Sequence, residues 1–237
     1  IDLINNGCGD IHSLVAKMSY PEIIGNCPIE EVKYKFKHWR SEAKGVEFAI
    51  NYGGDANTIH GNKGIPLVEA NKIYNNYMKG FKGMKVYQDR QRKFVMEHGY
   101  IITDFSSGRK AYIYDYDILM GIKARFNQEY WATYKPYKGK ENKLLPKQVK
   151  NELYQRFARG DNFNSMVGVY HYTTKKAGKD TIREAYVNIA DVYVHPVRHF
   201  FKRKSASEKQ AINYPCQGCG ATMFKTASIF LWEYLVE

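Results

Sequence analysis

The chain has 237 residues, of which 44% are hydrophobic and 15% aromatic, a composition that excludes a disordered chain and allows a sizeable core in one large or two small domains. Lys and Arg number 36 against 24 Asp and Glu, which gives a formal charge of +12 and favours a polyanionic partner, most often nucleic acid. No apolar run approaches 18 residues, so we expect no membrane span and, with no basic-then-apolar leader, a cytoplasmic location.

The first hundred residues read mainly as helices. The spacing of apolar residues predicts four of them, over residues 10–18, about 28–53, 66–79 and 82–98. Asp10 can cap the first helix, and Gly53 and Gly99 can stop the second and the fourth. The second run is also compatible with a break inside it.

Strand signals begin after these helices. Over about 100–117, "YIITDF" and "KAYIYDYD" alternate around "SSGR", which predicts a β-hairpin. Residues 118–204 mix a helical signal, "PKQVKNELYQRFA", with the strand-like "MVGVYHY" and "AYVNIADVYV". The last segment reads as one or two helices broken near Pro215. The predicted fold class is therefore mainly α with small β elements (α+β).

Positive charge is concentrated in residues 118–204, which hold 18 Lys and Arg against 7 Asp and Glu. Aromatic residues are interleaved with these charges: Phe126, Tyr130, Trp131, Tyr134, Tyr137, Tyr154 and Phe157. This mixture suits a surface that lies along a phosphate backbone. A merely solvated basic surface is the alternative.

Arg40, Lys44, Phe48 and Tyr52 follow one another at intervals of four residues, and two glycines come next. Residues at this spacing share one slowly turning face of an α-helix, about 18 Å long from first to last. Two cations can hold a polyphosphate, an aromatic ring can pack on a sugar or base, and glycines can let a nucleic-acid strand pass close. The alternative is an amphipathic helix with core aromatics and solvated cations.

The string R-x-x-x-K-x-x-x-F-x-x-x-Y-G, from Arg40 to Gly53, resembles the fingers-helix motif of family A DNA polymerases, the bacterial DNA polymerase I type and its phage relatives. "GDIHSLVA", which contains His12, is similar to the segment after that family's first catalytic motif. "EKQAINYPCQGCGATMFKTA" resembles the helix that meets primer and template. The resemblance covers about 9–117 and 205–235.

This resemblance implies a role for each matching residue. The triphosphate would be gripped by His12, Arg40 and Lys44, the sugar and base would meet Phe48, and Tyr52 would hold the template side until the fingers close. Primer and template would contact Tyr52, Gly53, Lys209, Asn213 and Gln217. Asn213 and Gln217 would read minor-groove acceptors that all base pairs share. The family usually has arginine where Lys209 stands. Lysine keeps the positive charge but lacks the planar, forked hydrogen-bond donors of a guanidinium.

The resemblance also implies a cofactor that this chain does not hold. Nucleotidyl transfer in the family uses two Mg²⁺ ions bound by aspartates. The motifs that carry those aspartates are absent from the sequence, so Mg²⁺ would be bound by residues outside this chain. We therefore expect the chain to be inactive alone, as a piece of a longer polymerase or a subunit of a split one. Its partners would be primer–template DNA, dNTPs and, in a split enzyme, the remaining polymerase chains.

Three segments follow from this interpretation: fingers at 1–117, with the nucleotide-binding helix at about 28–53 and the hairpin at about 100–117; a basic lineage-specific insertion at 118–204; and a palm-side helix at 205–237. The expected function is nucleotide and template binding in a phage-type DNA-directed DNA polymerase for replicative or repair synthesis. A fragment of a single-subunit RNA polymerase shares the Arg, Lys and Tyr-Gly spacing but lacks the aromatic. A non-enzymatic nucleic-acid-binding protein would explain the charge alone.

Three pairs of residues have the character of metal ligands: Cys216 with Cys219, His195 with His199, and Asp115 with Asp117. A zinc site would need further ligands besides the cysteines, and Pro196 argues against a regular helix through the histidines, which we therefore expect at the surface. The aspartates would point the same way only in a strand. We expect all the cysteines, with Cys8 and Cys27, to be free thiols.

Overall fold

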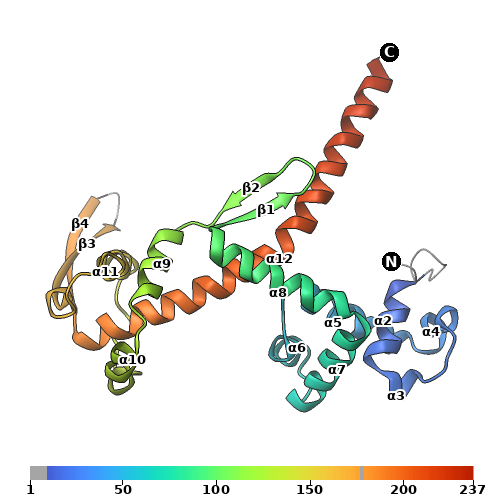
Figure 1. Cartoon of the computed structure of the whole chain (residues 1–237), viewed down its shortest axis with the longest axis horizontal. Coiled ribbons are helices and arrows are strands. Elements are labelled where there is room, and N and C mark those ends of the chain that lie inside the picture. Colours follow the sequence, from blue (N-terminus) through green and yellow to red (C-terminus); the bar gives the residue numbers. More distant parts are fainter. Residues whose placement is uncertain (1–9, 177–178, 237) are drawn as a thin grey trace. The chain divides into compact units, whose positions relative to one another are not determined.

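The computed structural model describes residues 10–176 and 179–236, which form two compact units (Figure 1). Unit 1 comprises the described residues up to Ala111 and those from Glu208 on, and unit 2 comprises Tyr112–Ser207. No described helix is both long and apolar enough to cross a membrane. Helices make up most of the described chain, and each sheet in it has two strands. The predicted mainly α fold with small β elements is confirmed.

Unit 1 runs through helices into a hairpin. Its elements before α12 are α2 (Ile11–Ser19), α3 (Pro21–Ile24), α4 (Ile29–Lys35), α5 (Lys37–Asn51), α6 (Ala56–Lys63), α7 (Leu67–Gly80), α8 (Lys82–His98), β1 (Tyr100–Asp104) and β2 (Arg109–Tyr112). Asp10 caps α2 as predicted, because its carboxylate accepts hydrogen bonds from two backbone N–H groups. The two predicted helices at 66–79 and 82–98 match α7 and α8 to within one residue. Helix α6 was not predicted.

The long helix predicted over 28–53 is two helices. Phe36, between α4 and α5, has a non-helical backbone (φ −126°, ψ 40°), and its side chain packs against the core of unit 1. Pro28 lies at the N-cap of α4. Gly53, with a φ of 76°, follows Tyr52, the C-cap of α5. The break thus leaves the stripe from Arg40 to Tyr52 on one helix.

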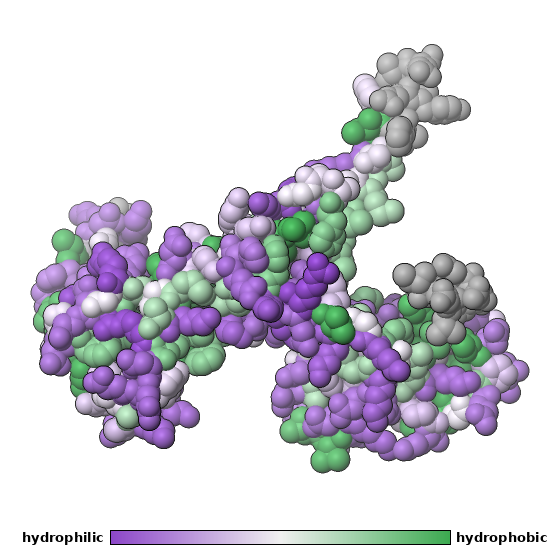
Figure 2. All heavy atoms as spheres, in the orientation of Figure 1, coloured by the Kyte–Doolittle hydropathy of each residue, from purple (hydrophilic) through white to green (hydrophobic). Residues whose placement is uncertain are grey.

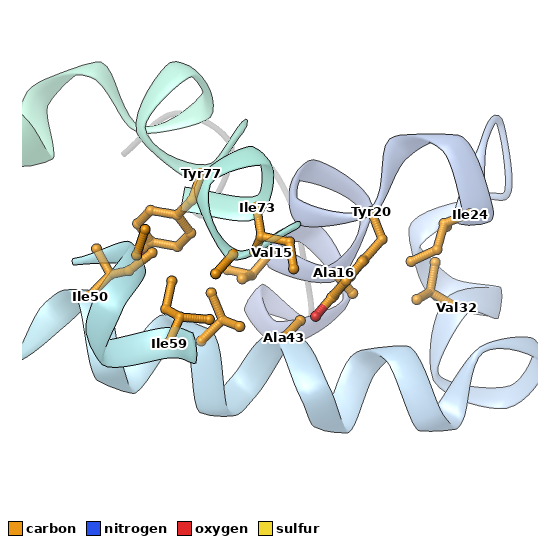
Figure 3. Packing of buried hydrophobic residues seen from close by; sticks show 13 residues of the cluster. Val15, Ala16, Tyr20, Ile24, Val32, Ala43, Ile50, Ile59, Ile73 and Tyr77 are labelled. Atoms are coloured by element: carbon orange, nitrogen blue, oxygen red, sulfur yellow. The ribbon is translucent and has the colours of Figure 1, made fainter. Parts of the chain in front are cut away.

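Apolar residues from α2, α5, α6 and α7 form the core of unit 1 (Figure 3). Tyr77 of α7 lies beside Ile50 of α5 and Ile59 of α6 in this view, and all three are at most 2% exposed. The Tyr77 hydroxyl donates a hydrogen bond to Asn51 Oδ1 (3.0 Å), which satisfies its one polar atom. This packing holds α5 by its buried face and leaves the opposite face to solvent.

Helix α12 (Ile189–Val236) contacts the β1–β2 hairpin within unit 1. The Thr222 hydroxyl donates to Asp104 Oδ2 (3.0 Å). At Gly218 the two backbones approach so closely that an added methyl group would overlap the carbonyl oxygen of Thr103. A glycine is therefore required where the helix crosses the strand.

The break predicted near Pro215 is wrong, because α12 continues through it (Figure 1). A proline inside a helix removes a hydrogen bond and crowds the preceding turn, at a cost of about 3 kcal/mol. Packing on both sides offsets this cost: Ala211 and Ile212 are buried before the proline, and Gly218 lies against the hairpin after it. Tertiary contacts here override a local signal that sequence alone cannot weigh.

Unit 2 contains α9 (Tyr116–Ala124), α10 (Gln128–Tyr134), η1 (Lys135–Tyr137), α11 (Lys147–Arg159), η2 (Asn164–Met166), β3 (Gly168–Lys176), β4 (Lys179–Val187) and the first part of α12. β3 and β4 pair antiparallel. The strand-like interpretation of "AYVNIADVYV" is correct only as far as Val187. Asn188 and Asp191 then exchange hydrogen bonds between side chain and backbone N–H (2.9 Å each), a capping box that starts α12 instead.

The predicted hairpin over 100–117 is shorter than expected. Strand β2 ends at Tyr112, and Asp115 has a left-handed backbone (φ 67°) at the N-cap of α9. Asp117 lies in the first turn of α9, where a carboxylate is favoured by the helix dipole. The two aspartates are therefore not paired on a strand.

The seven aromatic residues expected beside a phosphate backbone are all buried or half-buried in unit 2. Tyr130, 3% exposed, packs against several other rings and donates its hydroxyl hydrogen to the carbonyl oxygen of Tyr193 (2.6 Å). Its ring partners are Phe126, Trp131, Tyr134, Phe157, Phe163 and Tyr193. These residues build a core, and the expectation of an aromatic surface is corrected.

The expectation that His195 lies on the surface is wrong. Helix α12 passes through Pro196, and His195 is 5% exposed, with Nε2 3.0 Å from the carbonyl oxygen of Asn142. His199 is half-buried and stacks on Tyr154, with ring centroids 4.0 Å apart. Burial lowers the pKa of His199 because it penalises the charged imidazolium.

Replacing Gly218 by Ala tests the close crossing of α12 and β1. The methyl group has no room beside Thr103, so we expect a loss of about 1–3 kcal/mol in the free energy of unfolding. Gly220→Ala is the matched control, since nothing lies within 4 Å of the added methyl group and alanine favours the helix by up to about 1 kcal/mol. Urea unfolding followed by circular dichroism measures the free energy of unfolding of both variants. Equal stability of the two variants would contradict the close approach of α12 and β1 at Gly218.

Candidate nucleotide and nucleic-acid site

Lys44, Phe48 and Tyr52 lie in sequence along one exposed face of α5. Phe48 is 46% and Tyr52 50% exposed, and their rings stack with centroids 6.3 Å apart and planes 16° from parallel. The Lys44 ammonium lies over the Phe48 ring, 5.8 Å from its centroid. A cation–π contact at an exposed site contributes only about 0.5–1 kcal/mol. In the described part of the chain Lys44 has no carboxylate partner, so its charge is available to an incoming anion.

Arg40, one turn before Lys44, is held by a carboxylate. Its Nε lies 2.8 Å from Asp10 Oδ2 and its second guanidinium nitrogen 2.9 Å from Asp10 Oδ1, a bidentate ion pair. Hydrogen bonds from Arg40 hold the pKa of Asp10 well below its usual range, and the same pair raises the pKa of Arg40. Asp10 therefore both caps α2 and fixes the guanidinium that the sequence assigned to the triphosphate.

His12, the third predicted phosphate ligand, is paired with a second carboxylate. Its Nδ1 lies 2.8 Å from Glu47 Oε2, and Glu47 is 9% exposed on α5. Asp10 and His12 belong to the start of α2, whereas Arg40 and Glu47 belong to α5. The packing of α2 on α5 thus brings the three predicted phosphate ligands into one region of unit 1.

Gly53, which follows α5, packs against α12. A methyl group at Gly53 would lie 2.8 Å from Cδ1 of Ile212 and 3.7 Å from the Cα of Lys209. The Tyr87 hydroxyl donates to the carbonyl oxygen of Ile212 (3.0 Å) and ties the same turn of α12 to α8. The predicted primer–template residue Asn213 follows Ile212 directly. The end of the stripe and this turn of α12 are therefore neighbours.

The other predicted primer–template residues lie on this part of α12. Lys209, Asn213 and Gln217 are four residues apart and so share one face of the helix. Lys209 and Gln217 are exposed, and Asn213 is half-buried. The room beside Gly53, expected to admit a nucleic-acid strand, is filled by Ile212, while the room beside Gly54 is filled by the backbone of Ala49 and by Thr58.

The sequence did not assign the two carboxylates of the site. Asp10 was identified only as a helix cap, and Glu47 was not singled out at all. The available signal for Asp10 is a carboxylate two residues before the predicted ligand His12. Glu47 could be found only from the packing of α2 on α5.

The described residues do not supply a metal site. No three His, Cys, Asp or Glu side chains converge within 10–176 and 179–236 in a way that could hold a metal ion. Cys216 and Cys219 are exposed free thiols on α12, and Cys27 is a half-buried free thiol. Cys8 lies outside the described residues. The residues present thus do not fit Mg²⁺ or zinc.

Comparison with known proteins gives the family. The model of DNA polymerase family A matches residues 1–133, which is more than half of the chain. The chain belongs to DNA polymerase family A. A stretch of 76 residues is 36% identical to DNA polymerase I of Caldicellulosiruptor bescii and covers 32% of this chain. The same stretch covers 9% of the length of that polymerase.

Family A membership bears on one alternative that the sequence left open. The family match places the chain with DNA polymerases and not with the single-subunit RNA polymerases that share the Arg, Lys and Tyr-Gly spacing. The matched residues contain α2, α5 and the whole stripe from Arg40 to Tyr52. They end within α10 of unit 2.

Asp10→Asn tests the ion pair with Arg40. Asparagine also caps helices, so the change removes the charge and spares the cap, and we expect a loss of about 1–3 kcal/mol in the free energy of unfolding at pH 7. The folded state lowers the pKa of Asp10 below its unfolded value of about 3.9. The difference in the free energy of unfolding between wild type and variant therefore has its full size above about pH 5. It becomes smaller as the pH falls below about 4, because Asp10 then becomes protonated.

Urea unfolding at several pH values between 7 and 3 measures this difference. Asp55→Asn is the control, because Asp55 caps α6 and, within the described residues, forms no ion pair. We expect a smaller loss for Asp55→Asn than for Asp10→Asn. A difference for Asp10→Asn that stays constant with pH would show that the Arg40 pair does not form.

Proposed function

We propose that the chain is the nucleotide- and template-binding portion of a family A DNA polymerase, of the phage type and active in replicative or repair synthesis. The observation that carries this proposal is the order of Lys44, Phe48 and Tyr52 along one exposed face, with Arg40 and His12 beside its start. A cation followed by two rings matches a substrate that is charged at one end and aromatic at the other.

In this proposal the triphosphate binds at the start of the stripe. Lys44 approaches it as a mobile point charge, whereas the Arg40 guanidinium offers planar, bidentate hydrogen bonds to phosphate oxygens. His12 contributes a third donor from α2. Phosphate oxygens would take over donors that carboxylates hold in the free chain, so binding exchanges one set of charge-assisted hydrogen bonds for another.

The base and sugar lie further along the stripe. Phe48 offers an exposed ring for stacking, and Tyr52 closes the far end on the template side. Lys209 contacts a primer or template phosphate, and Asn213 and Gln217 donate to minor-groove acceptors. Gly53 keeps its backbone beside this face of α12, since no side chain separates the two.

The chemistry of nucleotidyl transfer lies outside this chain in our proposal. Mg²⁺ would be held by carboxylates of the remaining polymerase, because the described residues do not supply a fitting set. The chain alone would then bind substrate and DNA without extending a primer. The remaining polymerase chains are partners if the enzyme is split.

Lys44→Ala tests the assignment of the triphosphate site. Loss of one charge-assisted hydrogen bond to phosphate weakens dNTP binding by about 10–100-fold, while binding of primer–template changes much less. The control is Lys33→Ala, which removes another lysine that lies over an aromatic ring, that of Tyr34, on α4. Filter binding of labelled dNTP and of labelled primer–template measures both ligands for all three proteins.

The same assay separates the two remaining functions. A non-enzymatic nucleic-acid-binding protein binds DNA, ignores dNTP and shows no difference between the two variants. A polymerase portion retains dNTP in the wild type and in Lys33→Ala, and loses it in Lys44→Ala. Equal loss in both variants would contradict the role of Lys44.

A further inference from the structure

Unit 2 carries most of the net positive charge of the chain. Residues 112–207 contain 18 Lys and Arg against 9 Asp and Glu. Several of the acids are used internally: Asp161 pairs with Arg156, and Glu141 pairs with Arg198. These pairs remove two of the nine acids of unit 2 from the balance of charge at its surface.

The segment 135–147, here named the lysine loop, concentrates this charge. It contains five exposed lysines: Lys135, Lys138, Lys140, Lys143 and Lys147. Among the described residues none of them has a carboxylate within 4.0 Å. The acid within the loop, Glu141, is 5% exposed and turned towards Arg198, so it does not neutralise the loop surface.

The lysine loop is held in place from beneath by buried polar groups. The backbone N–H of Asn142 donates to Asp191 Oδ1 (2.6 Å), and the carbonyl oxygen of Asn142 lies 3.0 Å from His195 Nε2. Asp191 and His195 belong to the first turns of α12 and are 0% and 5% exposed. Lys150 of α11 donates to the carbonyl oxygen of Lys143 (3.0 Å). The lysines therefore stand on a fixed backbone, which reduces the entropy lost when they bind.

The loop offers charge without a stacking platform. The aromatic residues just before and within it, Tyr130, Tyr134 and Tyr137, are buried or half-buried among other rings. The most exposed large apolar side chain in the loop, Leu144, is 91% exposed and aliphatic. Single strands are bound largely through bases stacked on aromatic rings, whereas a duplex presents phosphates and keeps its bases inside.

We propose that the lysine loop of unit 2 binds the phosphate backbone of double-stranded DNA without reading its sequence. Charge complementarity and the absence of an exposed ring in the loop select a duplex over a single strand. In the surface view hydrophilic residues, mixed with hydrophobic ones, cover unit 2 (Figure 2). The loop lysines are not residues of the stripe on α5, so this proposal does not rest on the proposed nucleotide site.

The triple variant Lys138→Gln, Lys140→Gln and Lys143→Gln tests this proposal in the full chain. Each lost phosphate contact lowers the slope of log K against log salt by about 0.9, so we expect a decrease of about 2–3. The affinity for a duplex should fall by about tenfold or more at 0.1 M salt. Fluorescence anisotropy with a labelled 20-base-pair duplex and with one of its strands, at several salt concentrations, measures the slope and the preference.

A second triple variant controls for net charge. Lys123→Gln, Lys175→Gln and Lys179→Gln removes the same charge from exposed lysines of unit 2 outside the loop. We expect less than half of the change in slope. Equal effects of the two triples, or no effect of the first, would overturn the proposal. A larger loss of affinity for the single strand than for the duplex would overturn the choice of partner. Both triple variants should still retain dNTP, because their substitutions do not touch the proposed nucleotide site on α5.

Discussion

The geometry of unit 1 depends on a reciprocal pair of contacts between two helices. α2 presents Asp10 to Arg40 and His12 to Glu47, so each helix supplies one acid and one base. Because the two contacts are made at different turns of α5, they fix both the rotation and the register of α5 on α2. Lys44 lies between Arg40 and Glu47 in sequence but on the outer face. The arrangement thus holds Arg40 and His12 close to the helix pair and leaves Lys44 without a carboxylate partner among the described residues.

This division of charges has a consequence for binding order. In our proposal Arg40 and His12 bind phosphate only when their carboxylate partners share or release them, whereas Lys44 has no such partner among the described residues. Breaking a charge-assisted pair costs about 1.5–3 kcal/mol unless a new partner replaces it. In the proposed binding mode, an incoming triphosphate therefore meets Lys44 first and gains the other two donors in a second step. The carboxylates also keep the donors oriented, so less order has to be created on binding.

Much of unit 1 could be predicted because its signals are local. The cap at Asp10, the stop at Gly99 and the apolar spacing of α7 and α8 depend on residues within one turn of each other. The stripe on α5 could be predicted for the same reason, since a spacing of four places residues on one face wherever the helix lies. The continuous helix through Pro215 and the contact of Glu47 with His12 could not, because both depend on packing between segments distant in sequence.

Unit 2 shows why composition alone misassigns a basic, aromatic-rich segment. Lysine and aromatic residues alternate there in sequence, which favours a surface that uses both. In the fold they separate, because ring–ring packing in a core removes far more apolar area from water than an exposed stack would, while an ammonium group cannot be buried without a partner. Tyr130 and Phe157 are therefore inside and the loop lysines outside. The lysines of the loop therefore remain exposed while the rings do not. In our proposal this segment accordingly contacts phosphates and does not stack on bases.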